Sequence, residues 1–453
     1  MTVVTRKILD KSFTFGGLFT LALMAAALVC ILLPIFIRGA GAVVFYATNE
    51  HRRIEFEEFQ RGSPQTVSAE MEQRARLIAP IAAAVKAFEE SGLDKYRGKQ
   101  KREMRAEFNE LKSALAKLLG PFPGEEIPAL LRRQYGQTRL DRAREELHHV
   151  LRKEVWDYPT DAQGNQLVGK LVVTDRAEIF KGTALEAMFA YLEQNFEAIV
   201  QPRLTFYWPF FTSVSKDSHF FGGIFPELLG TFYLTIGAML FAVPIGVLSA
   251  VYLTEYTRQG TIVNIIRTCI NTLAGVPSIV FGLFGLTFFI VTLHVSNGKS
   301  VLAGAMTLSL LVLPTIIRAA EEAIKAVPAS YKEAALSLGA TKWHAIATVV
   351  LPAALPGILT GIVISMGRAA GETAPIIFTA AVSMGGIVGL GQVLDTPTPA
   401  LSWNIYNLVS EHEAVNEIRH VQYGMVATLI VLVLLLNLTA IVIRSHVAKK
   451  LKG

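Results

Sequence analysis

Two charged side chains lie inside an otherwise apolar stretch near residue 370. Arg368 and Glu372 are four residues apart, so a helix would place them on one face and within reach of each other. Gly357, Gly361 and Ser365 precede them at steps of four, four and three residues, which extends the same helical stripe. A guanidinium group offers a planar fork of donors that matches the oxygens of phosphate and related anions.

An arginine at the centre of a bilayer costs roughly 2.5–3.5 kcal/mol on insertion scales, so it usually faces a partner or a pathway. Three interpretations of the pair stay open. It could be a structural salt bridge, Arg368 could extend to the membrane interface, or the pair could line a path for an anion. In the third case Arg368 would contact the anion transiently, and Glu372 would limit how tightly the anion is held.

The candidate substrate path comprises five residues: Arg368, Glu372, Arg318, Ser365 and Thr373. Arg318 has a strong alternative interpretation as a cytoplasmic anchor or a local ion pair, because Glu321 and Glu322 follow it. Gly357 and Gly361 are assigned to helix packing, since small residues let two membrane helices approach closely.

The composition predicts the elements that would hold this stripe. Hydrophobic residues make up 52% of the 453-residue chain and charged residues only 18%. Apolar runs of about 20 residues are the length that a bilayer requires. Six such runs occur, at 18–37, 228–253, 270–293, 301–317, 353–378 and 423–443. We therefore predict an all-α integral membrane protein with six transmembrane helices, in the cell inner membrane.

The short loops predict the orientation. Arg6, Lys7 and Lys11 precede the first run, and Lys and Arg recur in alternate short loops and in the tail. Such residues favour the cytoplasmic side, so both termini are expected in the cytoplasm and the long first loop in the periplasm. The first run could alternatively be a signal peptide cleaved near Ala40-Gly41-Ala42. We favour an uncleaved anchor, because the run is long and Arg38 intervenes.

The predicted organisation has four parts. Residues 1–40 form the anchor, 41–221 a mostly helical extracytoplasmic insert, 222–445 the transmembrane core and 446–453 a basic cytoplasmic tail. The insert shows apolar residues at helical spacing, with a short strand expected at 171–173 after a turn at 161–165. The aromatic residues at 206–211 look interfacial, with core packing as the alternative.

A charged segment at 321–352 links the fourth and fifth spans. Pro328 suits the first turn of a helix, Gly339 suits its left-handed end, and Thr341 is placed to cap a second short helix. Two short helices joined at a glycine would make a compact cytoplasmic projection.

Within this projection, Glu333-Ala334-Ala335, Gly339 and Leu351-Pro352 resemble the EAA signature of ABC importer permeases. The resemblance implies a MetI-like core and a coupling helix that docks on a separate ATPase, with Glu333, Ala334, Ala335, Gly339 and Lys342 as the coupling residues. Further motifs narrow it to the PstA family of phosphate permeases. They are Gly230-Thr231, Pro244-Ile245-Gly246, the run Ala274–Gly285 and the run Arg368–Pro375. The match covers about 221–444, and the insert departs from the shorter family members.

The resemblance implies the membrane-spanning half of an ATP-driven importer of inorganic phosphate. The implied partners are a PstC-like sister permease, a PstB-like ATPase dimer and a PstS-like periplasmic phosphate-binding protein, besides phosphate and the lipid bilayer. The alternatives are a permease for another oxyanion, such as sulfate or molybdate, and a membrane-anchored sensor. No nucleic acid is expected as a partner.

This chain is expected to lack catalytic residues, a metal site and a cofactor of its own, leaving ATP and Mg to the partner ATPase. Gly164 to Lys170 has P-loop spacing, but Leu171 replaces the Ser or Thr that would hold magnesium. We read that run as chance. His148-His149 has no partners at ligand spacing.

Overall fold

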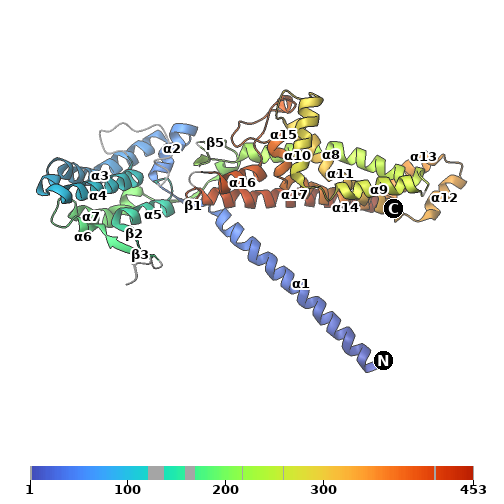
Figure 1. The fold of residues 1–453 in the computed structure, drawn as a ribbon, viewed down its shortest axis with the longest axis horizontal. Helices are drawn as coiled ribbons and strands as arrows, with labels where there is room; N and C mark the ends of the chain where they lie inside the picture. The colour runs from blue at the N-terminus through green and yellow to red at the C-terminus, as the bar shows by residue number, and fades with distance from the viewer. Residues whose placement is uncertain are drawn as a thin grey trace. The chain divides into compact units, whose positions relative to one another are not determined.

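A computed structural model describes residues 3–120, 137–158, 169–216, 218–258, 260–412 and 415–451. The chain folds into two compact units, Gly41–Trp208 and Met1–Ala40 with Pro209–Gly453. Their elements are labelled in Figure 1. The sequence predicts that the insert ends at residue 221, whereas in the structure residues 209–221 group with the membrane unit. Backbone pairing explains this, since the amides of Ile224 and Phe225 donate to the carbonyls of Phe210 and Ser213.

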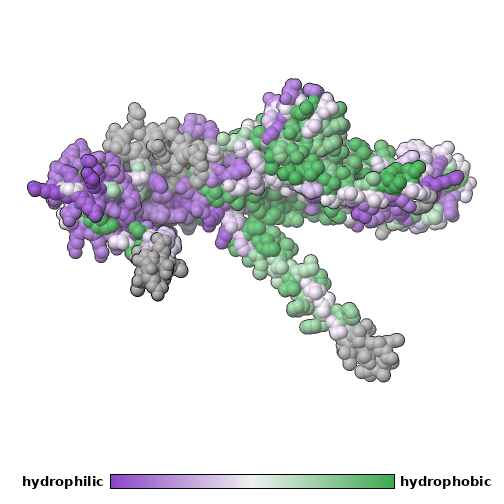
Figure 2. Space-filling view, viewed as in Figure 1, coloured by the Kyte–Doolittle hydropathy of each residue, from purple (hydrophilic) through white to green (hydrophobic). Residues whose placement is uncertain are grey.

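The membrane unit contains five helices within the described residues that are long and apolar enough to cross a bilayer. They are Ser12–Ala40, Phe225–Tyr256, Val301–Lys325, Lys342–Gly371 and Arg419–His446. A bent pair, Thr261–Leu273 and Ser278–Thr292, brings the number to six if it counts as one span. Figure 2 shows apolar surface over α8, α10 and α15 in this unit. The prediction of a mostly helical membrane fold is therefore confirmed, and the number of spans equals the predicted six if the bent pair counts as one.

The third predicted span, 270–293, is not continuous. Helix α9 (Thr261–Leu273) and helix α10 (Ser278–Gly285), which continues as η5 (Leu286–Thr292), meet at an angle of 100°. Pro277 stands at the break with an extended ψ of 136°. Proline lacks an N–H and disfavours helical geometry in the residue before it, so the helix ends here.

Helix α11 (Val301–Lys325) lies at the centre of the membrane unit. In the most apolar 18-residue stretch of α11, 67% of the residues are buried, whereas in the corresponding stretch of α1 (Val3–Ala40) none is buried. Helices α8 (Phe225–Val251) and α14 (Leu351–Gly371) pack against it, and α17 (Arg419–Leu451) packs against α14. Gly246 of α8 shows how close this packing is, because an added Cβ would lie 2.7 Å from Ile316.

Shorter elements complete the membrane unit. They are η3 (Trp208–Phe211), β5 (Ser215–Lys216), β6 (Phe221–Gly222), η4 (Tyr252–Tyr256), α12 (Ala329–Ser337), α13 (Lys342–Ala345), η6 (Ile346–Val350), α15 (Ala374–Thr379), η7 (Leu390–Gln392) and α16 (Leu401–Ser410). The fifth predicted span, 353–378, ends early at Gly371, because Glu372 is extended and Pro375 opens α15.

The other unit, Gly41–Trp208, is mostly helical. Its helices are α2 (Asn49–Phe59), α3 (Pro64–Ser91), η1 (Gly92–Lys95), α4 (Gly98–Leu119), α5 (Leu140–Leu151), α6 (Arg176–Ile179) and α7 (Glu186–Val200). Strand β1 (Val44–Ala47) pairs antiparallel with β4 (Arg203–Phe206), and β2 (Arg152–Asp157) with β3 (Lys170–Asp175). Strand β3 contains the short strand predicted at 171–173. The predicted turn at 161–165 and the start of the P-loop-like run lie outside the described residues.

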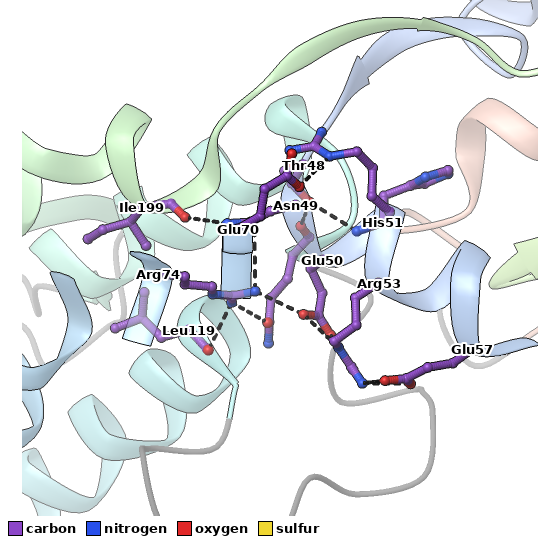
Figure 3. A network of polar contacts seen from close by, with 12 residues as sticks. Thr48, Asn49, Glu50, His51, Arg53, Glu57, Glu70, Arg74, Leu119 and Ile199 are labelled. Atoms are coloured by element: carbon purple, nitrogen blue, oxygen red, sulfur yellow. Dashed lines mark hydrogen bonds and ion pairs between the residues drawn. The ribbon is translucent and has the colours of Figure 1, made fainter. Parts of the chain in front are cut away.

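Buried charges hold α2 against this helical bundle, as Figure 3 shows. Glu50 accepts from Arg74 at 2.8 Å and from Arg53 at 2.5 Å, and Arg74 also donates to the carbonyl of Leu119 at 2.9 Å. Burial alone would raise the pKa of Glu50, but Arg74 and Arg53 outweigh burial and lower that pKa. The network is fully internal, so we assign it to the fold of the unit.

Candidate functional site

Arg368 and Glu372 form an ion pair at the end of α14. The Nε of Arg368 lies 3.3 Å from Oε1 of Glu372, and the two side chains are 38% and 19% exposed. Glu372 leaves the helix with an extended ψ of 130°, and its carbonyl accepts a hydrogen bond from Ser402 of α16 at 3.0 Å. The backbone of Glu372 is thus held by α16, its carboxylate contacts Arg368, and the Arg368 side chain is partly exposed.

The remaining residues of the predicted path do not form one open surface. Ser365 is fully buried, and its Oγ has no hydrogen-bond partner among the described residues. Thr373 follows Glu372 directly and is half-buried at the start of α15. The structure thus groups Arg368, Glu372 and Thr373 at the end of α14, with Ser365 in the packed interior one turn earlier.

Gly357 and Gly361 lie where α14 approaches α11. A Cβ added at Gly361 would lie 2.3 Å from the Cβ of Ala319, and one at Gly357 would lie 2.7 Å from the Cβ of Ala323. Real side-chain contacts are not that short, so only glycine fits this approach. These two contacts also show that the helices run antiparallel.

Arg318 is not beside Arg368. It is exposed on α11, without an ion pair in the described part of the chain. The antiparallel register, which pairs 361 with 319, puts Arg318 level with residue 362. Six residues then separate it from Arg368, which is about 9 Å along the helix axis. The two arginines would meet an anion at different depths.

The expected helix–glycine–helix projection is present. Helix α12 ends at Ser337, Gly339 adopts the left-handed region with φ of +87°, and the side chain of Thr341 accepts from the amide of His344 at 3.3 Å. The glycine turn and the threonine cap are therefore confirmed. The Glu333, Ala334 and Lys342 positions are exposed, and Ala335 is half-buried.

Large apolar side chains stand on the surface of this projection. Leu338 is 89% exposed, and Tyr331 and Trp343 are each 53% exposed. Exposed apolar groups gathered on a polar segment commonly mark a protein interface. The sequence motif gave these three residues no role.

The inner side of the projection is tied to the end of α8 by contacts that sequence reasoning missed. Lys332 pairs with Glu255 in η4, and the ammonium of Lys342 lies 4.7 Å from the ring centre of Tyr256. The charge of Glu255, opposite to that of Lys332, and the aromatic ring of Tyr256 were the available sequence signals. Lys332 and Glu255 are 77 residues apart, however, so only the fold shows that they pair.

A second missed cluster lies at the other end of α8. Nε2 of His219 is 2.8 Å from Oε1 of Glu227, and the amide of Asn404 donates to the same oxygen at 3.1 Å. The His219 and Glu227 side chains are almost fully buried. This cluster joins the segment before α8 to α16. A carboxylate in the first turn of an apolar span was its only sequence signal.

Packed apolar spans and an exposed helix–glycine–helix projection between two of them define a multi-pass helical membrane protein of the permease class. The comparisons agree. The chain belongs to the family described as the binding-protein-dependent transport system inner membrane component, whose model matches residues 242–453. It is therefore a transport subunit of the inner membrane, in a family that works with ATPase and binding-protein partners.

Two curated relatives show how similar this chain is to known permeases. The phosphate transport system permease protein PstA 1 of Mycobacterium tuberculosis (strain CDC 1551 / Oshkosh) is 38% identical over 225 residues, which is 50% of this chain and 71% of that protein. The probable ABC transporter permease protein YqgI of Bacillus subtilis (strain 168) is 36% identical over 211 residues, which is 46% of this chain and 66% of that protein.

Among solved structures, an inward-facing MetNI methionine ABC transporter matches at 23% identity with a TM-score of 0.36. That match covers 50% of this chain and 94% of the transporter chain.

Proposed function

We propose that this chain is the permease subunit of an ATP-driven inorganic phosphate importer and forms half of its translocation path. The observation that carries the proposal is the 38% identity to a phosphate transport system permease over 225 residues. The Arg368–Glu372 pair supplies suitable chemistry, since a guanidinium on a partly exposed side chain can contact a passing oxyanion.

Glu372 has a separate task in this proposal. It neutralises Arg368 while the path is empty and competes with the anion for it. A permease must release what it passes, so a weak and brief contact serves transport better than tight capture. Thr373 adds a hydroxyl beside the pair, and Arg318 adds a second positive charge about 9 Å deeper along α11.

The projection between α11 and α14 is the contact for the ATPase. Its exposed Leu338, Tyr331 and Trp343 fit an apolar groove on a PstB-like subunit, which would bind ATP and Mg. A PstC-like permease would complete the path, and a PstS-like binding protein would deliver phosphate. In the orientation proposed here both termini and the projection face the cytoplasm, and the unit Gly41–Trp208 faces the periplasm.

The first test is co-purification. The tagged chain should bring down an ABC ATPase, and ATP hydrolysis by the complex should rise when phosphate and the binding protein are added. Leu338→Asp should abolish ATPase recovery with the chain still in the membrane. Leu390→Asp is the matched control, because Leu390 is 80% exposed in a loop expected on the other side of the membrane. A chain that recovers no ATPase would favour the sensor interpretation.

The second test addresses the substrate path. Arg368→Gln should abolish phosphate uptake while leaving the membrane level and the assembled complex unchanged. Arg144→Gln serves as control, since Arg144 also forms an ion pair, with Glu197 at 3.1 Å, but on the exposed surface of the other unit. Near-normal uptake by Arg368→Gln would contradict the proposed role. Competition of labelled phosphate uptake by sulfate and molybdate separates the phosphate proposal from its oxyanion rivals.

A further inference from the structure

The two-stranded sheet β1–β4 exposes one wholly apolar face. The register pairs Val44 with Phe206 and Tyr46 with Leu204. These four side chains are between 45% and 66% exposed. Trp208 extends the face, because its ring stacks on that of Phe206 with centroids 6.3 Å apart. None of the five residues is charged.

The opposite face of the sheet fixes its orientation within the unit. Phe45 is 8% exposed and Ala47 is fully buried. The guanidinium of Arg139 lies 4.0 Å from the centre of the Phe45 ring, and the Tyr207 ring meets Phe45 edge-on at 6.0 Å. Because successive side chains of a strand alternate, anchoring Phe45 and Tyr207 inward forces the apolar set outward. The exposure is therefore built into the fold of the unit.

Both strands join membrane segments directly along the chain. Helix α1 ends at Ala40, and β1 begins at Val44. Four residues of extended chain reach at most about 14 Å, so Val44 cannot lie far from the surface where α1 leaves the bilayer. On the other strand, Trp208 is the last residue before the membrane unit resumes at Pro209.

The composition of the face suits lipid better than water. Tyrosine and tryptophan with an apolar neighbour are the side chains enriched at the level of lipid headgroups. The other hairpin of the same unit, β2–β3, also exposes apolar residues, but each of its faces carries charged residues as well, among them Lys153, Glu154 and Lys170. That hairpin suits water, whereas the β1–β4 face does not.

We infer that the apolar face of β1–β4, formed by Val44, Tyr46, Leu204, Phe206 and Trp208, rests on the lipid bilayer. Lipid headgroups and the upper acyl chains are the occupant. This inference does not depend on which anion the permease carries.

Spin-label accessibility tests the inference on the full chain. Cys30 and Cys269 are replaced by serine, and one cysteine is then placed by Val44→Cys or Leu204→Cys. Each variant leaves four apolar residues of the face in place. Trp156→Cys on β2 is the matched control, because Trp156 is 58% exposed in the same unit. The labelled chain is reconstituted in vesicles of phosphatidylcholine and phosphatidylglycerol.

Oxygen concentrates in the bilayer and a neutral nickel chelate stays in water, so the ratio of the two collision rates reports lipid contact. The ratio should be several-fold higher at positions 44 and 204 than at 156. Equal, water-like ratios at all three positions would overturn the inference. Low collision rates with both reagents at 44 and 204 would also overturn it, because they would mean that protein covers the face.

A variant that disrupts the apolar face tests whether the label at position 44 contacts lipid because of that face. Phe206→Asp places a carboxylate in the middle of the face, where it would have to leave the lipid. With this change, the label at position 44 should shift to the water-like ratio of position 156, while far-UV circular dichroism stays unchanged. A label at 44 that still favours oxygen in the Phe206→Asp chain would refute the inference.

Discussion

A close contact between helices α11 and α14 predicts a strong effect of side-chain size, which a second substitution should reverse. In Gly361→Ala the new methyl carbon would lie 2.3 Å from the Cβ of Ala319, where ordinary contacts begin near 3.4 Å. Helices α11 and α14 must therefore separate locally by about 1 Å or distort, and overpacking of this kind costs about 1–3 kcal/mol. We expect the solubilised chain to lose thermal stability accordingly.

A second change at the same contact should restore it. Ala319→Gly removes the clashing methyl group, and the next atom, the Cα of Ala319, lies at an ordinary 3.7 Å. The double variant should therefore recover most of the loss, with a coupling energy of about 1–3 kcal/mol in a double-mutant cycle. The cycle also cancels the helix propensities of glycine and alanine, which differ by about 1 kcal/mol.

Gly371→Ala is the control on the same helix, because an added Cβ there meets nothing within 4 Å. The measurement is the fraction of full-length chain that stays monodisperse in detergent after heating. Equal tolerance of Gly361→Ala and Gly371→Ala, or strictly additive effects in the cycle, would refute the packing argument.

Three further predictions follow from individual contacts. Lys332→Gln and Glu255→Gln should each reduce phosphate-stimulated ATP hydrolysis, and the double variant should be no worse than either, because both changes remove one ion pair. Thr341→Ala should weaken ATPase recovery through loss of a helix cap worth about 1 kcal/mol, whereas Thr341→Ser should not. Burial, with the charges of Arg139 and Arg52, lowers the pKa of His51 to about 3 from an ordinary 6.5, so the folded state disfavours its protonation. Stability should therefore fall as pH drops from about 6.5 toward 3, by at most about 5 kcal/mol, and thermal unfolding of His51→Phe should depend less on pH.

Local rules predicted the features that depend on a few neighbouring residues. Gly339 takes the left-handed conformation that ends a helix, and Thr341 caps the next one. Hydropathy located the spans for the same reason, since bilayer thickness fixes their length. The break at Pro277 is also a local signal, because proline interrupts a helix. The run around it was interpreted only through its resemblance to the family, so the break was not predicted.

Features that depend on which face of a helix is buried were not predictable in this way. A membrane helix can be apolar all round, so periodicity does not separate its lipid-facing side from its packed side. Ser365 illustrates the problem, because it shares a stripe with Arg368 yet lies inside the helix packing. The aromatic run at 206–211 shows the same ambiguity. Phe206 and Trp208 are exposed and Tyr207 and Phe210 are buried, so neither interfacial nor core packing describes the whole run.

The projection is joined to the spans that pack on α11 in two ways. One connection follows the chain, from α12 through η6 into α14. The structure adds a second, because Lys332 and Lys342 join the projection to the end of α8. Helices α8 and α14 both pack closely on α11, at Gly246 and Gly361 respectively.

A displacement of the projection should therefore reach α11 from two sides. Along α14 it must travel 17 residues from Leu351 to Arg368, which is about 26 Å of helix. If the projection moved α14 alone, α14 could pivot over that length without moving its neighbours. If it moves α8 and α14 together, α11 must move as well, because both helices pack on it. We expect Glu255→Gln, which removes the Lys332 contact of the α8 route and leaves α14 untouched, to give reduced but measurable phosphate uptake. Complete loss of uptake in an assembled Glu255→Gln complex would show that α8, and not α14, carries the motion.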